Sequence, residues 1–328
     1  MQAWPRMQAL QAVLPKIRRA LSLLLLGGTL GCELDEATLA EPQDIAVAEV
    51  YLNIGDRDDH LSAFFHWTLS TRSSRDLLGL DVKVVREDGL EVPLVPDDLS
   101  NCVIPDLEGE IEGVCYSPIF EIEGVFEPGT RVSLEVFFED GSVLKGATQI
   151  PEDIQLIRPA VGERCALPPG KALEFVWNRS SGVWAYSAET EIRNLQDALA
   201  AQGVAVEEDS VALLGLAISE SDTTIVFPKE FGIIERFDLE QDLALALQGG
   251  LPRGAIADVV VAALDQNYVN WVRGGNFNPS GLVRISSLRG SGVGVFASTV
   301  RRTVLILGED PEYLPGDILP NCLSDGGS

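Results

Sequence analysis

The sequence predicts a mostly β protein with two antiparallel β-sandwich domains in tandem, the second carrying short helical insertions. Three observations predict this fold class. Short runs rich in β-branched and aromatic residues recur along the chain. Turn-forming pairs, Asp88-Gly89 and Asp140-Gly141, divide alternating runs into hairpins. Hydrophobic residues make up 46% of the chain, as in a folded globular protein.

Residues 1–31 have the character of an export leader. Four basic residues precede an apolar run from Ala20 to Gly31. This run is shorter than the roughly 20 residues of a membrane-spanning helix. It matches the ~7–15-residue apolar region of a signal peptide.

The leader ends in Thr29-Leu30-Gly31-Cys32, which resembles the lipobox of bacterial lipoproteins, with Thr29 in place of the usual Leu. The resemblance implies cleavage before Cys32, a diacylglyceryl thioether on its sulfur and acylation, as by palmitate, of the new N-terminus. Two or more acyl chains hold a protein stably at a membrane. The alternatives are ordinary cleavage after Ala40 and an uncleaved anchor. Residues 32–44, rich in acids, are expected to form an extended tether.

Two sandwich domains and a tail are expected after the tether. The first covers residues 45–151, the second residues 152–310, and the polar tail residues 311–328. In the second domain, Trp177 and Trp184 are expected to fill the core. Two helices are expected there, one at 194–203 with Asn194 as N-cap and one at 238–249 with Asp238 as N-cap.

The cysteines favour an oxidising compartment. Five are present, and four remain once Cys32 is set aside, which is an even number suited to two disulfides. Of the three pairings, we favour Cys102–Cys115 across a short acidic hairpin, which leaves Cys165 with Cys322. A metal site is the alternative, but no two cysteines have C-x-x-C spacing.

The charge disfavours nucleic acid as a partner. The chain has 24 basic and 50 acidic residues and a net charge of −26. The leader holds four of the basic residues and none of the acidic ones, so the mature part carries −30. Such a surface repels phosphate backbones.

Several short motifs carry a family resemblance. They are "DGSVLKGATQIP" at the end of the first strand-rich unit, then "DQNYVNW" and "GSGVGVFAS". With the lipidated leader, this order resembles a broad group of uncharacterised bacterial envelope lipoproteins with tandem immunoglobulin-like domains. The resemblance implies immunoglobulin- or fibronectin-III-like sandwiches and a lipid-anchored location at the cell envelope. Because Glu33 follows Cys32, we expect the outer membrane or cell surface. The group has no catalytic residues to transfer.

The segment 265–281 is the strongest candidate for recognition. It mixes aromatic rings with amides and a guanidinium, which are side chains that bind sugars, peptides or proteins. The candidate binding residues are Asn267, Tyr268, Trp271, Arg273 and Phe277. The alternative is a loop that packs its aromatic rings on the second sandwich.

Two other segments offer weaker sites. Asp56, Asp58 and Asp59 place three carboxylates on one loop, as a Ca²⁺ site requires, although a solvated hairpin loop is the alternative. Gly290, Gly292 and Gly294 resemble a phosphate-cradling loop, but a strand follows where a helix is needed. A tight turn that only glycine fits is therefore favoured for these glycines. No other cofactor is expected.

The sequence thus predicts an exported, lipid-anchored, non-catalytic binding or interaction module. Its expected partners are the membrane, through the lipid, and an envelope protein or an extended ligand. The enzyme alternative is a hydrolase of the envelope that uses paired carboxylates. A third alternative is a purely structural surface protein.

Overall fold

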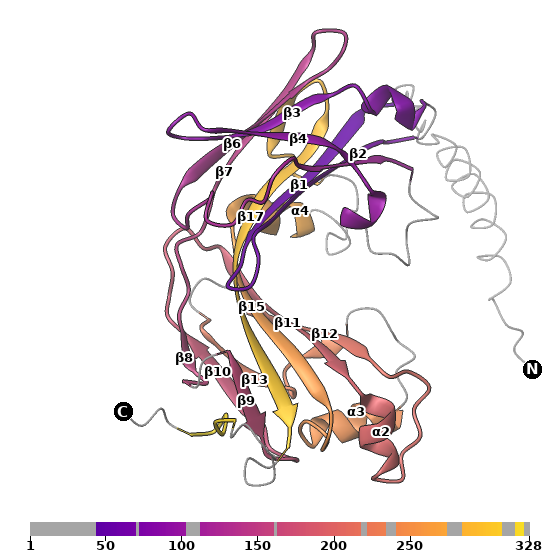
Figure 1. The fold of residues 1–328 in the computed structure, drawn as a ribbon, viewed down its shortest axis with the longest axis vertical. Helices are drawn as coiled ribbons and strands as arrows, with labels where there is room; N and C mark the ends of the chain where they lie inside the picture. The colour runs from indigo at the N-terminus through magenta and orange to yellow at the C-terminus, as the bar shows by residue number, and fades with distance from the viewer. Residues whose placement is uncertain are drawn as a thin grey trace, which may run out of the picture. The chain divides into compact units, whose positions relative to one another are not determined.

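The computed structural model describes residues 44–69, 72–102, 112–160, 163–217, 222–233, 241–273, 284–309 and 319–324. The chain is mostly β, as predicted (Figure 1). The strands are β1 (Ala46–Ile54), β2 (His60–Trp67), β3 (Asp81–Arg86), β4 (Glu91–Asp97), β5 (Val114–Pro118), β6 (Arg131–Phe137), β7 (Val143–Gln149), β8 (Leu156–Arg158), β9 (Arg164–Leu167), β10 (Leu173–Trp177), β11 (Ala185–Arg193), β12 (Val211–Ala217), β13 (Thr224–Phe227), β14 (Gly232–Ile233), β15 (Ile256–Leu264), β16 (Leu288–Gly290) and β17 (Val293–Gly308). The helices are the 3₁₀ turns η2 (Ser74–Leu77) and η3 (Leu99–Asn101) and the α-helices α2 (Leu195–Ala200), α3 (Gln241–Gln248) and α4 (Gln266–Arg273).

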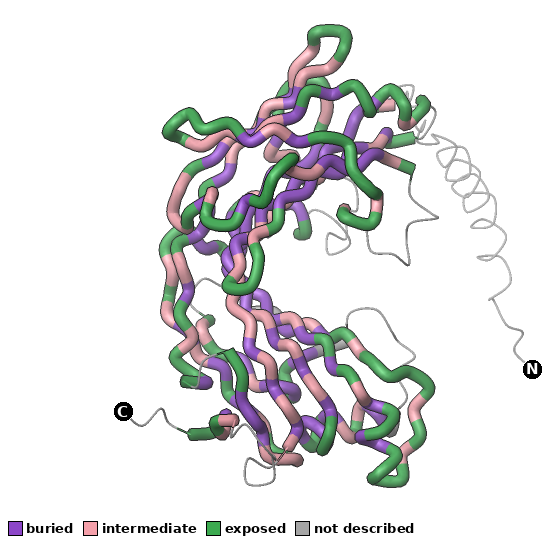
Figure 2. The backbone as a smooth tube through the Cα atoms, in the orientation of Figure 1, coloured by how far each residue is buried: buried purple, intermediate pink, exposed green. Residues whose placement is uncertain are grey.

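The strands of the first half form a two-layer sandwich. Strands β17, β1, β2 and β5 follow one another in one layer, and β4, β3, β6, β7 and β16 continue in the other. Strand β5 pairs with both β2 and β4 and so joins the layers. Alternate residues of β1 and β6, such as Val50 and Leu134, are buried in the shared core (Figure 2).

The second half is also a two-layer sandwich. One layer runs β14-β12-β11-β15-β17, and the other is the separate sheet β13-β10-β8. Trp177 is fully buried between the layers, where its ring meets Tyr186 edge-on at 5.4 Å. The prediction for Trp184 is wrong, because this side chain is 46% exposed. The buried positions at this end of β11 are taken by Val183 and Ala185 on either side of it.

Strand β17 belongs to both halves. Its residues Val293–Val300 pair in parallel with β1, and its residues Thr299–Leu307 pair antiparallel with β15. One sheet therefore continues from the first half into the second (Figure 1). The domain limits 45–151 and 152–310 stay a prediction. The pairing of β17 with β1 shows in addition that the last strand lies beside the first one.

Two of the helices lie where the sequence predicts them. Helix α2 follows Asn194, which takes the N-cap position at a φ of 61°. Its side chain does not cap the helix but donates to the Gly254 carbonyl at 2.8 Å. Helix α3 falls in the second predicted stretch, whose N-cap candidate Asp238 lies outside the described residues. Helix α4 was not predicted.

Gly290, at the end of β16, and Gly294, near the start of β17, serve strand pairing. Gly294 has a φ of 141°, and a Cβ added to it would lie 1.9 Å from the Ala48 carbonyl oxygen on β1. A Cβ at Gly290 would meet the Val143 carbonyl oxygen at 2.1 Å. Only glycine fits such close backbone approaches. This confirms the tight-turn interpretation over a phosphate loop.

Both predicted disulfides are present. Cys102 and Cys115 have Cα atoms 5.6 Å apart, and the Cα atoms of Cys165 and Cys322 are 5.1 Å apart. The second bond holds the chain end against β9, where Cys322 N donates to the Ala166 carbonyl at 2.9 Å. The tail thereby covers a sheet edge that would otherwise expose unpaired backbone groups. No helix of the described residues is long and apolar enough to cross a membrane.

Candidate functional site

A polar hollow of about 270 Å³ lies on the outer face of the continuous sheet. It spans β1, β2, β11, β15 and β17, and its rim includes helix α4 and the turn η3. Tyr51 and Asn53 reach it because residues alternate along β1, so that Val50 and Leu52 enter the core. Its lining residues are Tyr51, Asn53, His60, Ser62, Asn101, Cys102, Glu189, Ala262, Leu264, Tyr268, Thr299 and Arg301.

Strand register brings polar groups from distant segments into one row. Asn53 lies opposite His60 on β2 and opposite Thr299 on β17. The Thr299 hydroxyl donates to Asn53 Oδ1 at 2.7 Å. Each of these residues is fixed by a ladder on a rigid sheet, which is the arrangement that holds a binding site in shape.

An ion pair forms another wall of the hollow. Arg301 on β17 donates from Nη2 to Glu189 Oε2 on β11 at 3.2 Å. Their side chains are 34% and 43% exposed. A pair this exposed contributes at most about 1 kcal/mol to stability. Its main effect is therefore to present a donor and an acceptor side by side with no net charge.

Two tyrosines also line the hollow. The rings of Tyr51 and Tyr268 meet edge to face with centroids 5.9 Å apart. The Tyr51 hydroxyl donates to Glu49 Oε2 at 3.3 Å. Burial, and then the charge of Glu49, raise the pKa of Tyr51, and burial raises the pKa of Tyr268. Both phenols are therefore uncharged at neutral pH and offer hydroxyl groups to the hollow.

Buried hydrogen bonds set the position of Tyr268. Asp265, which is 2% exposed, caps α4 by accepting from the Tyr268 N–H at 2.7 Å. Its other oxygen accepts from the Thr148 hydroxyl of β7, which lies 3.0 Å from the Ser298 hydroxyl. Burial raises the pKa of Asp265 to about 6, although these hydrogen bonds lower it.

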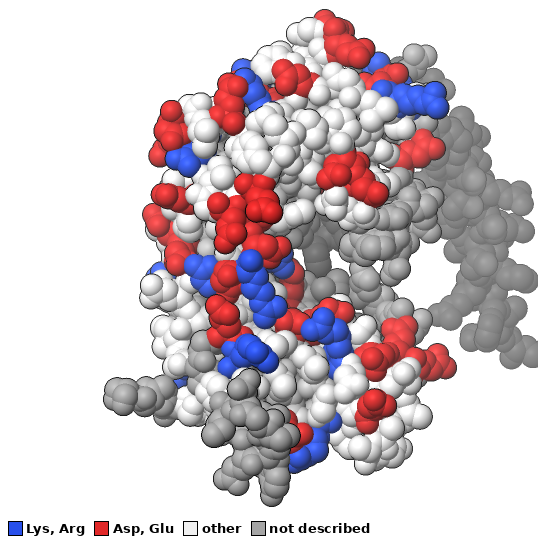
Figure 3. All heavy atoms as spheres, viewed as in Figure 1, with Lys and Arg blue, Asp and Glu red and all other residues white. Residues whose placement is uncertain are grey.

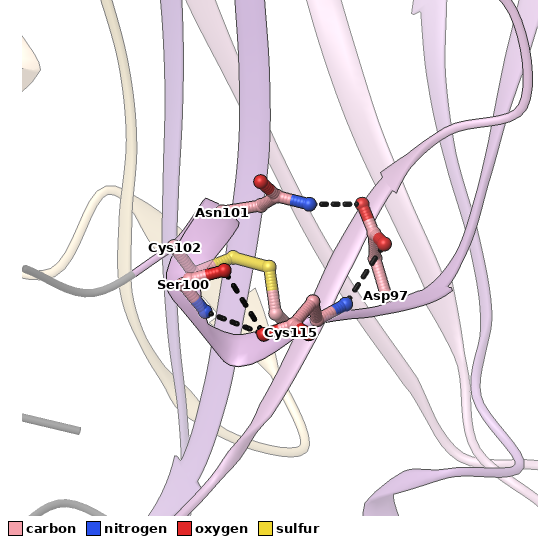
Figure 4. Close-up of a disulfide and its surroundings, with 6 residues drawn as sticks. Asp97, Ser100, Asn101, Cys102 and Cys115 are labelled. Atoms are coloured by element: carbon pink, nitrogen blue, oxygen red, sulfur yellow. Dashed lines mark hydrogen bonds between the residues drawn. A yellow bond between two sulfur atoms is a disulfide. The ribbon is translucent and has the colours of Figure 1, made fainter. Parts of the chain in front are cut away.

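The Cys102–Cys115 disulfide closes the rim on the side of η3 (Figure 4). Asn101 Nδ2 donates to Asp97 Oδ2 at 2.8 Å, and Ser100 N donates to Asp98 Oδ1 at 3.1 Å. These bonds and the disulfide fix Asn101 and Cys102 beside the hollow.

Two of the five predicted binding residues, Trp271 and Asn267, are held in the fold by packing or backbone hydrogen bonds. Trp271 is 6% exposed and packs against Val47 and Val295, and Asn267 donates to the carbonyls of Ala147 and Phe296 at 2.9 and 2.8 Å. Only Tyr268 lines the hollow. Arg273 is exposed at the end of α4, and Phe277 lies outside the described residues.

The sequence did not assign the other lining residues to a binding site, although Cys102 was predicted as a disulfide cysteine. For two of them the sequence pattern does predict exposure, since Tyr51 and Asn53 stand at the outward positions of the alternating run "VYLNI". Alternation alone, however, does not tell which strand lies beside which.

Two of the three aspartates proposed for Ca²⁺, Asp56 and Asp59, accept hydrogen bonds from backbone groups. Asp56 Oδ2 accepts from Thr303 N at 2.7 Å. Asp59 accepts from Gly55 N and Gly124 N at 3.1 and 3.0 Å. Among the described ranges, no group of three or more His, Cys, Asp or Glu side chains is placed to hold a metal ion.

Comparison with known proteins gives no family. No family model matches the sequence, and no curated protein matches it. Among solved structures, the chain is similar to "Crystal structure of Dpr11 IG1 bound to DIP-gamma IG+IG2", with 8% identity, 81% of this chain and 100% of that chain covered, and a TM-score of 0.19. It is also similar to "Crystal structure of DIP-gamma IG1+IG2", with 8% identity, 80% and 99% coverage, and a TM-score of 0.18. At these TM-scores neither likeness carries an argument about this chain.

Proposed function

We propose that this chain is an exported, lipid-anchored, non-catalytic binding module of a bacterial envelope, and that the polar hollow contacts its partner or extended ligand. One observation carries the proposal. The hollow gathers two neutral tyrosines, a balanced ion pair and several amide and hydroxyl groups on a rigid sheet. Concave sites with a few well-placed polar groups are the usual places where proteins bind ligands.

The state of the carboxylates supports binding rather than hydrolysis. A glycoside hydrolase needs one carboxyl group that donates a proton and a second that attacks or activates water. In the hollow, Glu189 is paired with Arg301. Asp265 is buried behind the hollow and is bonded to Thr148 and to the Tyr268 N–H. Burial raises its pKa, whereas the cap bond from the Tyr268 N–H lowers it, so the raised pKa needs no catalytic role to explain it.

The disulfides support export. Two disulfides pair four of the five cysteines, and such bonds persist in oxidising compartments. The one cysteine outside both pairs is Cys32, the residue that the lipobox resemblance assigns to a lipid. We therefore place the protein at the envelope, held by acyl chains on Cys32 and most naturally at the outer membrane or cell surface.

A site-specific photo-crosslinker tests the binding site. A photoreactive residue at His60, which is exposed beside the hollow, should capture a partner or ligand in the native envelope. The matched control carries the same group at Arg131, which is exposed on β6 outside the hollow. A product specific to His60 supports the proposal. Equal yields at both positions, or no product at either, would contradict it.

A further inference from the structure

We infer that the polar hollow binds an uncharged, polyhydroxylated ring, such as one sugar unit of an extended glycan. This inference rests on the proposed function and names the ligand class of the same site. Its size, its charge balance and its hydrogen-bonding groups each point to this class.

The size favours a single small ring. Sites for drug-sized ligands enclose ~300–1,000 Å³, and this hollow encloses about 270 Å³. A ligand that enters it is therefore one unit in size. Since the hollow opens on the sheet face, a longer chain can continue outside it.

The charge balance disfavours an ion. Arg301 is neutralised by Glu189, and Arg284 near the other wall is neutralised by Glu49 at 3.3 Å. Tyr51 and Tyr268 are uncharged. An anion in the hollow would meet the Glu189 carboxylate, and a cation would meet the Arg301 guanidinium. Acidic side chains are also spread over the protein face drawn in Figure 3, which raises the cost of bringing an anion to that face.

The polar groups match a set of hydroxyls. A sugar hydroxyl both donates and accepts, so it pairs equally with the Arg301 guanidinium and the Glu189 carboxylate. The phenol of Tyr268, the hydroxyl of Ser62 and the amide of Asn53 add further partners around the same space. The apolar edges of the tyrosine rings suit the C–H surface of a sugar ring.

Saturation-transfer NMR on the intact protein tests the inference. The probes are free glucose, galactose, mannose and N-acetylglucosamine, with glucose 6-phosphate as the charged comparison. We expect at least one neutral sugar to bind, and Glu189→Gln to weaken that binding tenfold or more. The matched control is Glu174→Gln, which breaks the Arg158–Glu174 ion pair on β10 but leaves the hollow intact. Far-UV circular dichroism verifies that both variants stay folded.

Three results would overturn the inference. They are no binding of any neutral sugar, tighter binding of a charged probe, and equal losses in the two variants. If His60 still captures a partner specifically while no sugar binds, the ligand class is wrong and the proposed function stands. If the crosslinker at position 60 captures nothing specific while a sugar binds in a Glu189-dependent manner, the ligand class stands. The proposal that the hollow contacts a partner protein is then refuted.

Discussion

Asp265 carries a carboxyl group that is almost fully buried. Burial raises its pKa from 3.8 to about 6. The folded state therefore holds the proton more tightly than the unfolded state, and stability is lost as the pH rises between about 4 and about 6. One pKa unit corresponds to about 1.4 kcal/mol, so the charged form costs about 3 kcal/mol at pH 7. Asp265→Asn should remove this cost. Its unfolding free energy relative to the wild type should rise by up to about 3 kcal/mol from pH 4 to pH 7, as measured by urea denaturation.

Asp88 provides a control, because its pKa is shifted in the opposite direction and its stability contribution therefore changes with pH in the opposite sense. This exposed carboxylate accepts from the Leu90 N–H at 3.1 Å, and that bond lowers its pKa. Its contribution to stability is present at neutral pH and is lost as the pH falls. Asp88→Asn should therefore lose stability relative to the wild type as the pH rises. A stability difference that does not vary with pH for Asp265→Asn would mean that the Asp265 carboxyl has the same pKa in the folded and the unfolded state.

At the scale of elements, local patterns predict the hairpins better than the helices. The Asp88-Gly89 and Asp140-Gly141 turns were predictable because glycine adopts the positive φ, 89° and 81°, that such tight turns require. Helix α4 was missed because it is rich in Asn, Tyr, Trp and Val, which are weak helix formers. Its stability comes from the Asp265 cap and from packing of Val269 and Trp271 on the sheet. The capping residue Asp265 could be recognised in the sequence, whereas the sheet surface on which α4 packs could not.

Trp271 tests whether α4 is held by packing or serves recognition directly. Its ring is buried against Val47 and Val295, with the Arg284 guanidinium 4.9 Å from its centre. Trp271→Ala should lower the unfolding free energy by about 3 kcal/mol or more, since a large buried side chain is lost. Trp184→Ala is the matched control, because that ring is 46% exposed, and it should cost less than about 1 kcal/mol. Weakened partner capture by Trp271→Ala at unchanged stability would instead support a direct role in recognition.

At the scale of the whole molecule, the sequence predicts the layers but not how they join. The parallel pair of β1 and β17 brings Asn53 beside Thr299, residues far apart in the chain. No local pattern specifies a pairing over such a separation, because its register depends on the packing of the complete core. The hollow is built across this junction. Its residues therefore came from several segments, of which only the one containing Tyr268 was proposed from the sequence.

The cysteine pairing also allows the membrane anchor to be tested on the intact protein. Because the two disulfides account for Cys102, Cys115, Cys165 and Cys322, Cys32 is the cysteine outside both pairs and can carry the lipid. If Cys32 carries the proposed lipid, Cys32→Ala should move the protein from the membrane fraction to the soluble fraction in the producing bacterium, since acyl chains hold a protein at a membrane. Immunoblots of the fractions measure this, and mass spectrometry measures the lost lipid.

The paired substitution Cys102→Ala and Cys115→Ala is the control. It removes a disulfide, which contributes about 3 kcal/mol for a loop of this length, but it leaves the anchor and should keep the protein at the membrane. Membrane association that survives Cys32→Ala would show that something other than a lipid on this cysteine holds the chain.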